Sequence, residues 1–346
     1  MCITEKLKKT IIGVPKTIYR ALFLILLLID AIGFNLEPML KKIEICNVAA
    51  DYNSLIAIFP SITQIAQDYK YVFLALTVAT FVLWMYRPKL FLVKQISFSP
   101  DIAEVHPDIL KKYRVKETEI NQCTAMKRTD TIVNAIIEQD KIAESILIGR
   151  KSSSLCYYGI AHTPLVFRLG FKMGDQNNLM LLHRIRTNDS QFEEWTEEGG
   201  YSTITPRENN TLITSNELIV SVSTSIKISD QDLDSLQPEN KHILAFESNN
   251  LMFDSITSYK CAESYRNAIM ISIRDYVKKY GIQKIHLVIS SSVAFTFFLG
   301  QAFSAQHDPI TVVYHFQNGT YPWGICINES AEKALVINNV TYITGT

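Results

Sequence analysis

The sequence has 346 residues, of which 47% are hydrophobic and 20% charged, and its 34 basic side chains balance its 34 acidic ones. This neutral balance excludes the strongly basic surface with which proteins coat nucleic acids. With 13 glycines, 11 prolines and many aliphatic residues, the chain fits neither a collagen-like nor a disordered class. Its six cysteines form no Cys-x-x-Cys pair, which argues against a disulfide framework or a zinc ribbon.

Two apolar runs lie near the N-terminus. Residues 18–34 read IYRALFLILLLIDAIGF and contain only Arg20 and Asp30 as ionisable side chains, and residues 71–86 read YVFLALTVATFVLWMY. As helices these runs would measure roughly 25 and 24 Å, close to the ~30 Å hydrocarbon thickness of a bilayer. A signal peptide and a buried core helix are the alternatives, but no small-residue cleavage site follows Phe34. The sequence therefore predicts two membrane spans.

Basic residues around these runs set the expected orientation. They cluster before the first run and after the second: Lys6, Lys8, Lys9, Lys16, Arg87, Lys89 and Lys94. The positive-inside rule then places both termini in the cytoplasm of the cell. We expect a cytoplasmic N-terminus over 1–16, spans over 17–36 and 70–87, and an outer loop over 37–69. Asp30 would help the spans associate, line a pore or lie near the far interface, and the interface is the favoured interpretation.

Beyond residue 88 the sequence alternates between short strands and helices. The strands are expected over 91–98, 154–160, 179–185, 218–223, 242–246, 284–289, 310–316 and 323–327, and the helices over 129–147, 164–171, 255–280 and 293–303. A polar stretch over 188–216 is expected to be rich in loops. Helices between strands indicate an α/β fold.

Two segments of this region resemble each other. HTPLVFRLG at 162–170 aligns with SVAFTFFLG at 292–300, an offset of 130 residues. Each segment follows a predicted strand and precedes another one. Similar strand–helix–Gly–strand patterns at a domain-sized spacing predict a duplicated α/β lobe, with chance similarity of two generic units as the alternative.

Catalytic and metal sites find little support in the sequence. The triplet Ser290–Ser292 stands between a strand and a helix, where a nucleophile elbow would lie, but such a turn needs small flanking residues. Its neighbours are instead bulky or aliphatic: Val288, Ile289, Val293 and Ala294. The seven histidines include no His-x-x-x-His pair, and no glycine-rich phosphate loop is present. We expect no enzymatic activity, no metal and no cofactor.

Ligand binding is the better supported prediction. In parallel α/β sheets, ligands bind outside the carboxyl ends of the strands, next to helix N-termini. Three crossovers offer short polar side chains at such positions: Ser248, Asn249 and Asn250; Ser290, Ser291 and Ser292; His162 and Thr163. Lys151 and Lys260 could add positive charge, and Trp195, Tyr321 and Trp323 could stack on bases. Alternatively, the Ser and Asn residues are ordinary helix caps and Trp323 belongs to the core.

The C-terminal pattern resembles a known family. KIHLVIS at 284–290, FFLG at 297–300, VVYH at 312–315 and YPW at 321–323 are similar to the SAVED domain. That family pairs two CARF-like (Rossmann-like) lobes and binds cyclic oligonucleotides made by cGAS-like nucleotidyltransferases in bacterial antiphage (CBASS) systems. The order of two spans followed by one such domain resembles the two-transmembrane SAVED effectors.

This resemblance implies a fold and a function. The domain would cover 88–346, with lobe 1 over about 95–236 and lobe 2 over about 237–346. The protein would bind a cyclic di- or trinucleotide-type messenger, form a homo-oligomer, and disrupt the bacterial inner membrane in abortive infection, without binding DNA or RNA polymers. A membrane-anchored nucleotide or lipid hydrolase and a passive membrane-tethered nucleotide-binding scaffold are the alternative functions.

Overall fold

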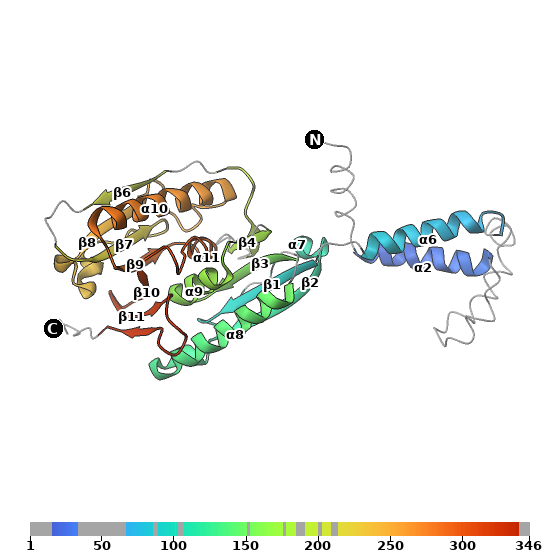
Figure 1. Ribbon diagram of the computed structural model, residues 1–346. Coiled ribbons are helices and arrows are strands. Elements are labelled where there is room, and N and C mark those ends of the chain that lie inside the picture. Colours follow the sequence, from blue (N-terminus) through green and yellow to red (C-terminus); the bar gives the residue numbers. More distant parts are fainter. Residues whose placement is uncertain are drawn as a thin grey trace. The chain divides into compact units, whose positions relative to one another are not determined.

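A computed structural model shows the fold of the chain (Figure 1). It describes residues 16–33, 67–85, 89–100, 102, 105, 107–150, 153–175, 178–184, 191–199, 203–208 and 214–338. The predicted outer loop therefore lies almost wholly outside the described residues. The chain divides into two compact units, Met1–Lys89 with Pro107–Arg114, and Leu90–His106 with Val115–Thr346.

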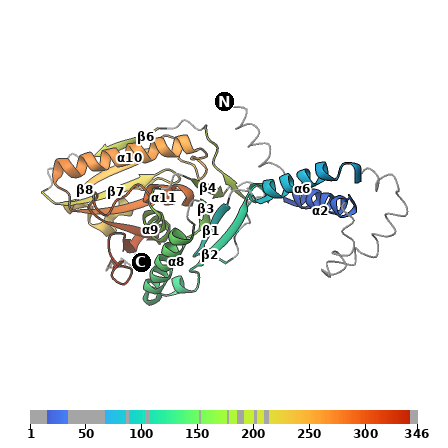
Figure 2. The ribbon, with the colours of Figure 1, turned by 45° about the vertical axis from the view of Figure 1, so that its right-hand side comes forward.

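The first unit contains a pair of helices, α2 (Lys16–Gly33) and α6 (Lys70–Met85), which lie side by side (Figures 1 and 2). The rings of Phe23 and Phe81 meet between the helices with centroids 5.6 Å apart. Large apolar side chains cover the outside of the pair and are 38–70% exposed: Leu22, Leu24, Ile25, Leu27, Tyr71, Val72, Leu74, Leu76, Val78, Phe81 and Val82. Across the described residues, no helix combines the length and the apolar character needed to cross a membrane.

Asp30 lies in the last turn of α2 and contacts α6. Its side chain is buried, and Thr77 Oγ1 donates a hydrogen bond of 2.5 Å to its Oδ2. This contact favours a role of Asp30 in helix association, the alternative given from the sequence, and its depth in a membrane stays a prediction. Asp30 connects the two helices, because a carboxylate surrounded by apolar side chains needs a hydrogen-bond donor.

The second unit begins with a five-stranded sheet in the order β2-β1-β3-β4-β5. Its strands are β1 (Lys89–Ile96), β2 (Arg114–Asn121), β3 (Ser154–Ile160), β4 (Leu179–Arg184) and β5 (Phe192–Glu194). β1, β3 and β4 run parallel, and β5 runs antiparallel to β4. Helix α8 (Ile132–Arg150) precedes β3, and α9 (Thr163–Met173) connects β3 to β4. This arrangement confirms the α/β prediction for the first lobe.

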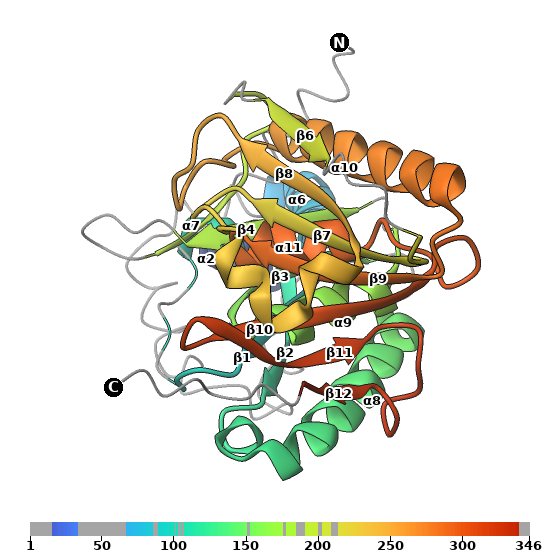
Figure 3. The ribbon, with the colours of Figure 1, turned by 90° about the vertical axis from the view of Figure 1, so that its left-hand side faces the viewer.

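A seven-stranded sheet forms the second lobe, in the order β12-β11-β10-β9-β7-β8-β6 (Figure 3). Its strands are β6 (Ile204–Glu208), β7 (Glu217–Ser223), β8 (His242–Ser248), β9 (Lys284–Ser290), β10 (Ile310–Gln317), β11 (Thr320–Cys326) and β12 (Leu335–Ile337). The central strands β8, β7, β9 and β10 run parallel. β6 and β7 belong to this sheet, so it begins well before residue 237.

Two helices follow the central strands of the second sheet. Helix α10 (Tyr259–Tyr280) begins at the N-cap Ser258, whose Oγ accepts a hydrogen bond from Cys261 N–H, and ends at Gly281 in the left-handed conformation. Such a glycine terminates a helix without the strain that a side chain would add. Helix α11 (Val293–Gly300) follows β9 directly and is buried along almost its whole length.

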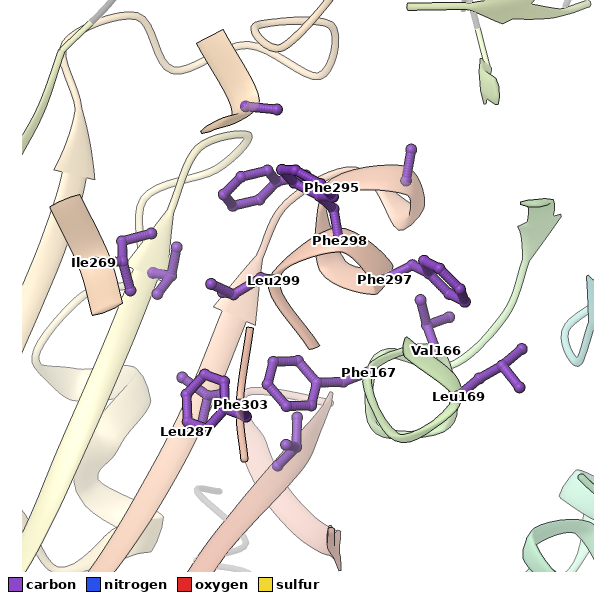
Figure 4. Packing of buried hydrophobic residues seen from close by; sticks show 14 of the residues in the cluster. Val166, Phe167, Leu169, Ile269, Leu287, Phe295, Phe297, Phe298, Leu299 and Phe303 are labelled. Atoms are coloured by element: carbon purple, nitrogen blue, oxygen red, sulfur yellow. The ribbon is translucent and has the colours of Figure 1, made fainter. Parts of the chain in front are cut away.

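Helices α9 and α11 pack against each other between the two lobes. Figure 4 shows Phe297 of α11 reaching toward Val166 of α9, while Phe167 of α9 lies beside Phe303 with ring centroids 5.2 Å apart. One hydrophobic cluster contains residues of both sheets, so the two lobes share a core. Burial of this cluster fixes how the carboxyl ends of β3 and β9 face each other.

Candidate ligand-binding site

A cavity of about 280 Å³ lies where the two lobes meet. It is lined by the ends of strands β3, β4 and β9, by the first residues of helices α9 and α11, and by the loops that follow β7 and β8. Its polar and charged lining residues are Thr163, His183, Arg184, Ser225, Asp254, Ser290, Ser291 and Ser292. The cavity thus occupies the position where parallel α/β sheets bind ligands.

The serine triplet is organised by neighbouring backbone and hydroxyl groups. Ser292 caps α11, because Phe295 N–H donates to its Oγ at 3.3 Å. The Ser291 and Thr224 hydroxyls share a hydrogen bond of 2.7 Å, and Ile226 N–H donates to Ser290 Oγ at 3.1 Å. These contacts hold the triplet against the loop after β7, so its hydroxyl groups line the cavity in fixed positions.

Both helices that separate the strands begin at this cavity. The first residues of α9 and α11, Thr163 and Val293, are both part of the lining. Helix N-termini carry unpaired N–H groups and the positive end of the helix dipole, which favour anions such as phosphate. The first residues of two helices and four serines therefore line the same space.

The cavity also holds charged and titratable groups that the sequence analysis did not single out. Arg184, the last residue of β4, is exposed, and its guanidinium forms no ion pair with any described residue. His183 is 7% exposed, and burial lowers the pKa of its imidazole below 6.5, although the nearby Asp254 and Glu193 carboxylates act in the opposite direction. The ring is therefore neutral at neutral pH. Arg184 lies near the end of the strand predicted over 179–185. This position at the end of a strand could have identified it as a site residue.

Comparison with known proteins identifies the family. The SAVED family, described as the SMODS-associated and fused to various effectors sensor domain, matches residues 138–327, which is more than half of the chain. The chain belongs to the SAVED family. No curated protein matches its sequence at a significant level.

Solved structures similar to this SAVED chain include receptors from two bacteria. The Acinetobacter baumannii Cap4 SAVED/CARF-domain containing receptor with 2'3'3'-cAAA aligns with a TM-score of 0.47 and 16% identity, over 79% of this chain and 60% of that one. The Moraxella osloensis Cap4 receptor aligns with a TM-score of 0.42 and 16% identity, over 79% of this chain and 64% of that one. The chain thus spans less than two thirds of the length of these structures.

His162 lies outside the cavity of the serine triplet in the SAVED domain, in contrast to its neighbour Thr163. It lines a second cavity of about 380 Å³ together with Ser97, whose hydroxyl bonds His162 Nδ1 at 2.6 Å. The His162 ring stacks on Phe98 with centroids 3.9 Å apart and meets the ring of His315 at 4.7 Å. Burial lowers the pKa of His162 to about 3 and that of His315 to about 4.

The crossover after β8 does not contribute its predicted residues to the cavity of the serine triplet either. Ser248 and Asn249 line a third cavity of about 410 Å³. Asn250 N–H donates to Ser248 Oγ at 3.1 Å, and the Ser248 and Tyr265 hydroxyls lie 2.8 Å apart. β8 lies on the far side of β7 from β9, so the start of its crossover is displaced from the other two. Phe253 and Asp254, farther along the same loop, line the cavity of the serine triplet instead.

The predicted stacking residues belong to the core. Trp195, Tyr321 and Trp323 are only 2%, 3% and 6% exposed. Trp195 packs edge-on against Tyr259, and Trp323 packs against His315. A ring that is covered by protein on both faces cannot receive a base, so the stacking prediction is wrong for these three residues.

The two lysines that were expected to add charge do not line the described cavity. Lys260 lies on the exposed side of α10, and its Nζ is 4.0 Å from Glu198 Oε1. Lys151 lies outside the described residues. Of the predicted site residues, the structure therefore brings together Thr163 and the serine triplet, and Arg184 is the cation that accompanies them.

Proposed function

We propose that this SAVED chain is a receptor for a cyclic oligonucleotide messenger in CBASS-type antiphage defence. The observation that carries this proposal is the convergence of two helix N-termini, the serine triplet and Arg184 on one cavity between the lobes. A cyclic oligonucleotide carries one negative charge for each phosphate. Helix N-termini, hydroxyl groups and an unpaired guanidinium are the groups that bind phosphate most readily in proteins.

The same cavity supports a binder rather than an enzyme. A serine nucleophile needs an adjacent general base that takes its proton. Ser291 and Ser290 instead bond Thr224 Oγ1 and Ile226 N–H, and Ser292 accepts from Phe295 N–H. We therefore propose that the chain binds and releases the messenger without altering it chemically. We also propose that a cGAS-like nucleotidyltransferase supplies the messenger.

We further propose that the two segments predicted as membrane spans, over 17–36 and 70–87, act on the inner membrane; α2 and α6 are their described parts. The apolar exterior of the α2–α6 pair supports this proposal, because such a surface is unfavourable in water. Asp30 is hydrogen-bonded to Thr77 within the pair, so its carboxylate is directed away from the apolar outside. Binding of the messenger would drive assembly of several copies only if it favours the assembled state. Clustered helices would then disrupt the membrane.

Titration calorimetry on the full-length chain in mild detergent tests the receptor proposal. The first probes are 2'3'3'-cAAA and 3'3'3'-cAAA, the cyclic trinucleotides named in the solved Cap4 structures, followed by a panel of cyclic di- and trinucleotides that contain guanine or pyrimidines. Saturable binding of at least one ring is the expected result. Absence of binding across the panel contradicts the proposal. Chromatography of the probe after incubation separates a receptor from a hydrolase, which would release linear products.

Leakage of a dye from vesicles tests the membrane proposal independently. We expect vesicles that contain the full-length chain to leak only after addition of the ring that binds the chain in the calorimetry. Equal leakage with and without the ring contradicts control by the messenger. A variant in which an unrelated anchor replaces both helices should bind the ring normally and cause no leakage. If the chain were only a passive scaffold, this replacement would preserve its function.

A further inference from the structure

Two exposed apolar side chains line the cavity of the serine triplet, from the loops that follow β7 and β8. Ile226 is 57% exposed and Phe253 is 45% exposed. A single exposed apolar side chain needs no explanation, but two that line one polar cavity provide a place for an apolar part of a ligand. Arg184 and the serine triplet line the same cavity, so it offers apolar and anion-binding groups together.

Hydrogen bonds hold the segment that carries Phe253. Ser255 N–H donates to the carbonyl oxygen of Met252 at 3.1 Å, so Phe253 and Asp254 are the two central residues of a β-turn. Both ends of this turn bond the carbonyl oxygen of Thr224, with Met252 N–H at 3.3 Å and Ser255 Oγ at 3.0 Å. The turn after β8 is therefore fixed to the loop after β7.

Thr224 also connects this turn to the serine triplet. Its N–H donates to the carbonyl oxygen of Ser290 at 2.9 Å, and its hydroxyl shares a hydrogen bond of 2.7 Å with the hydroxyl of Ser291. Ile226 N–H donates to Ser290 Oγ at 3.1 Å. The apolar side chains and the hydroxyl groups thus belong to one hydrogen-bonded framework. A ligand that contacts both would bind a preformed surface, which lowers the cost of ordering the loops.

We infer that Phe253 stacks on a base of the bound messenger, with Ile226 as an apolar wall of the same subsite. Each nucleotide joins a flat aromatic base to an anionic phosphate, and the cavity offers a partner for each. The base would lie at Phe253, and the phosphate at Arg184 and the serine triplet. An exposed ring can receive any base, because every base has a π-face. This inference rests on the proposed function and specifies how the same cavity holds its ligand.

Titration calorimetry on the full-length chain in mild detergent compares two neighbouring side chains. The probes are 2'3'3'-cAAA, 3'3'3'-cAAA and the rings of the same panel that contain guanine or pyrimidines. Phe253→Ala should weaken binding of each ring that the unmodified chain binds by about tenfold or more, because the base loses its stacking partner. Met252→Ala is the matched control, since Met252 is 53% exposed but does not line the cavity. It should change the affinity by less than about twofold.

Fluorescence of Phe253→Trp gives a readout that a role in packing would not affect. The indole keeps an aromatic face in the turn, so this variant should bind the rings more tightly than Phe253→Ala does. A base that stacks on the indole should quench the emission that the added tryptophan contributes. Met252→Trp adds the same fluorophore outside the cavity, and binding of a ring should leave its added emission unchanged.

The outcomes separate this inference from the proposed function. Weaker binding by Phe253→Ala alone, together with quenching in Phe253→Trp alone, supports the inference. If Phe253→Ala binds the rings as tightly as the unmodified chain, or if Phe253→Trp is not quenched, the inference is overturned and the receptor proposal stands. Equal losses for Phe253→Ala and Met252→Ala also overturn it, because the two side chains would then act as one surface, such as a contact with a second copy.

Two further points keep the test decisive. If no ring of the panel binds the unmodified chain, the receptor proposal and the inference are both overturned. If Phe253→Ala fails to fold, Phe253→Trp still tests the inference, because it retains an aromatic side chain in the turn and its quenching reports contact with the base directly.

Discussion

Gly170 of α9 lies against the backbone carbonyl of Phe297 in α11, so closely that a Cβ atom at Gly170 would overlap it. The reciprocal contact also exists, because a Cβ atom at Gly300 would overlap the carbonyl oxygen of Phe167. Gly170 corresponds to Gly300, and Phe167 to Phe297, through the same offset of 130 residues that relates 162–170 to 292–300. The two copies of the repeated segment thus pack against each other with approximate two-fold symmetry, which supports the duplication predicted from the sequence.

The first prediction concerns this crossing of helices. Gly170→Ala should lower the free energy of unfolding by about 3 kcal/mol, because the added methyl group must push the backbones of α9 and α11 apart. Gly149→Ala, in α8, is the control, since a Cβ atom there meets only Phe91 at 4.0 Å. It should be neutral or slightly stabilising. Urea denaturation measures both, and equal stability of the two variants would contradict the close packing.

A second prediction concerns the buried Arg168. It is 0% exposed, forms two hydrogen bonds to Asp140 of 3.0 and 2.7 Å, and donates to the carbonyl oxygens of Cys326 and Glu329 at 2.8 and 3.0 Å. It therefore connects α8 and α9 to the second lobe. Arg168→Leu should cost about 3 kcal/mol or more, since two carbonyl groups lose their donor and Asp140 loses its bidentate partner, although Lys172 Nζ remains 3.3 Å from its Oδ2. Arg207→Ala breaks an exposed pair with Asp230 and should cost less than about 1 kcal/mol. A small loss for Arg168→Leu in urea denaturation would refute this role.

The third prediction concerns the ligand site. Ser291→Asp should abolish binding of the messenger, because a carboxylate in the cavity, two residues before the start of α11, would repel phosphate. Asn249→Asp adds the same charge to the separate cavity beside Arg207 and should leave the affinity unchanged. Calorimetry compares the two variants with the unmodified chain. Unchanged affinity in Ser291→Asp would show that the messenger binds elsewhere.

Arg184 gives a fourth prediction at the same site. Arg184→Gln should weaken binding by about tenfold and reduce its dependence on salt, because the cation of the cavity is lost. Lys260→Gln removes an exposed cation that does not line the cavity and should have no such effect. Titrations at two salt concentrations distinguish a phosphate contact from a packing role, which would leave the salt dependence unchanged.

Local patterns in the sequence predict the elements of the second lobe well. The strand expected over 284–289 is Lys284–Ser290, and the helix expected from residue 293 begins at Val293. The short strands β5 and β6 were missed within the stretch expected to be rich in loops, because their few residues are mostly polar and exposed. They are stabilised by pairing with neighbouring strands, which the local sequence does not encode.

The ligand site was predictable only in part, for a related reason. The serine triplet follows a strand and precedes a helix, so its place at the carboxyl edge of a sheet could be inferred from order alone. His183, Arg184 and Asp254 come together only because the lobes pack face to face through α9 and α11. Trp323 was mistaken for a stacking residue because it is buried in a cluster with Ile132, Ile136 and Leu165 of the first lobe. Contacts between distant segments decide both cases.

The last prediction concerns acid stability. His162 and His315 have pKa values lowered to about 3 and about 4, in both cases mainly by burial, and the charge of His315 further disfavours protonation of His162. In the unfolded chain both would titrate near 6.5, so below that pH the unfolded state binds more protons than the folded state. Stability is therefore fully present above about pH 6.5 and falls as the pH decreases toward 4, by up to about 1.4 kcal/mol per pH unit for each histidine. Urea denaturation at pH 7 and pH 5 measures this loss. His315→Asn should reduce the difference in stability between the two pH values, because it removes one of the histidines that are protonated on unfolding and the positive neighbour of His162. The same pH dependence in this variant would contradict the assignment.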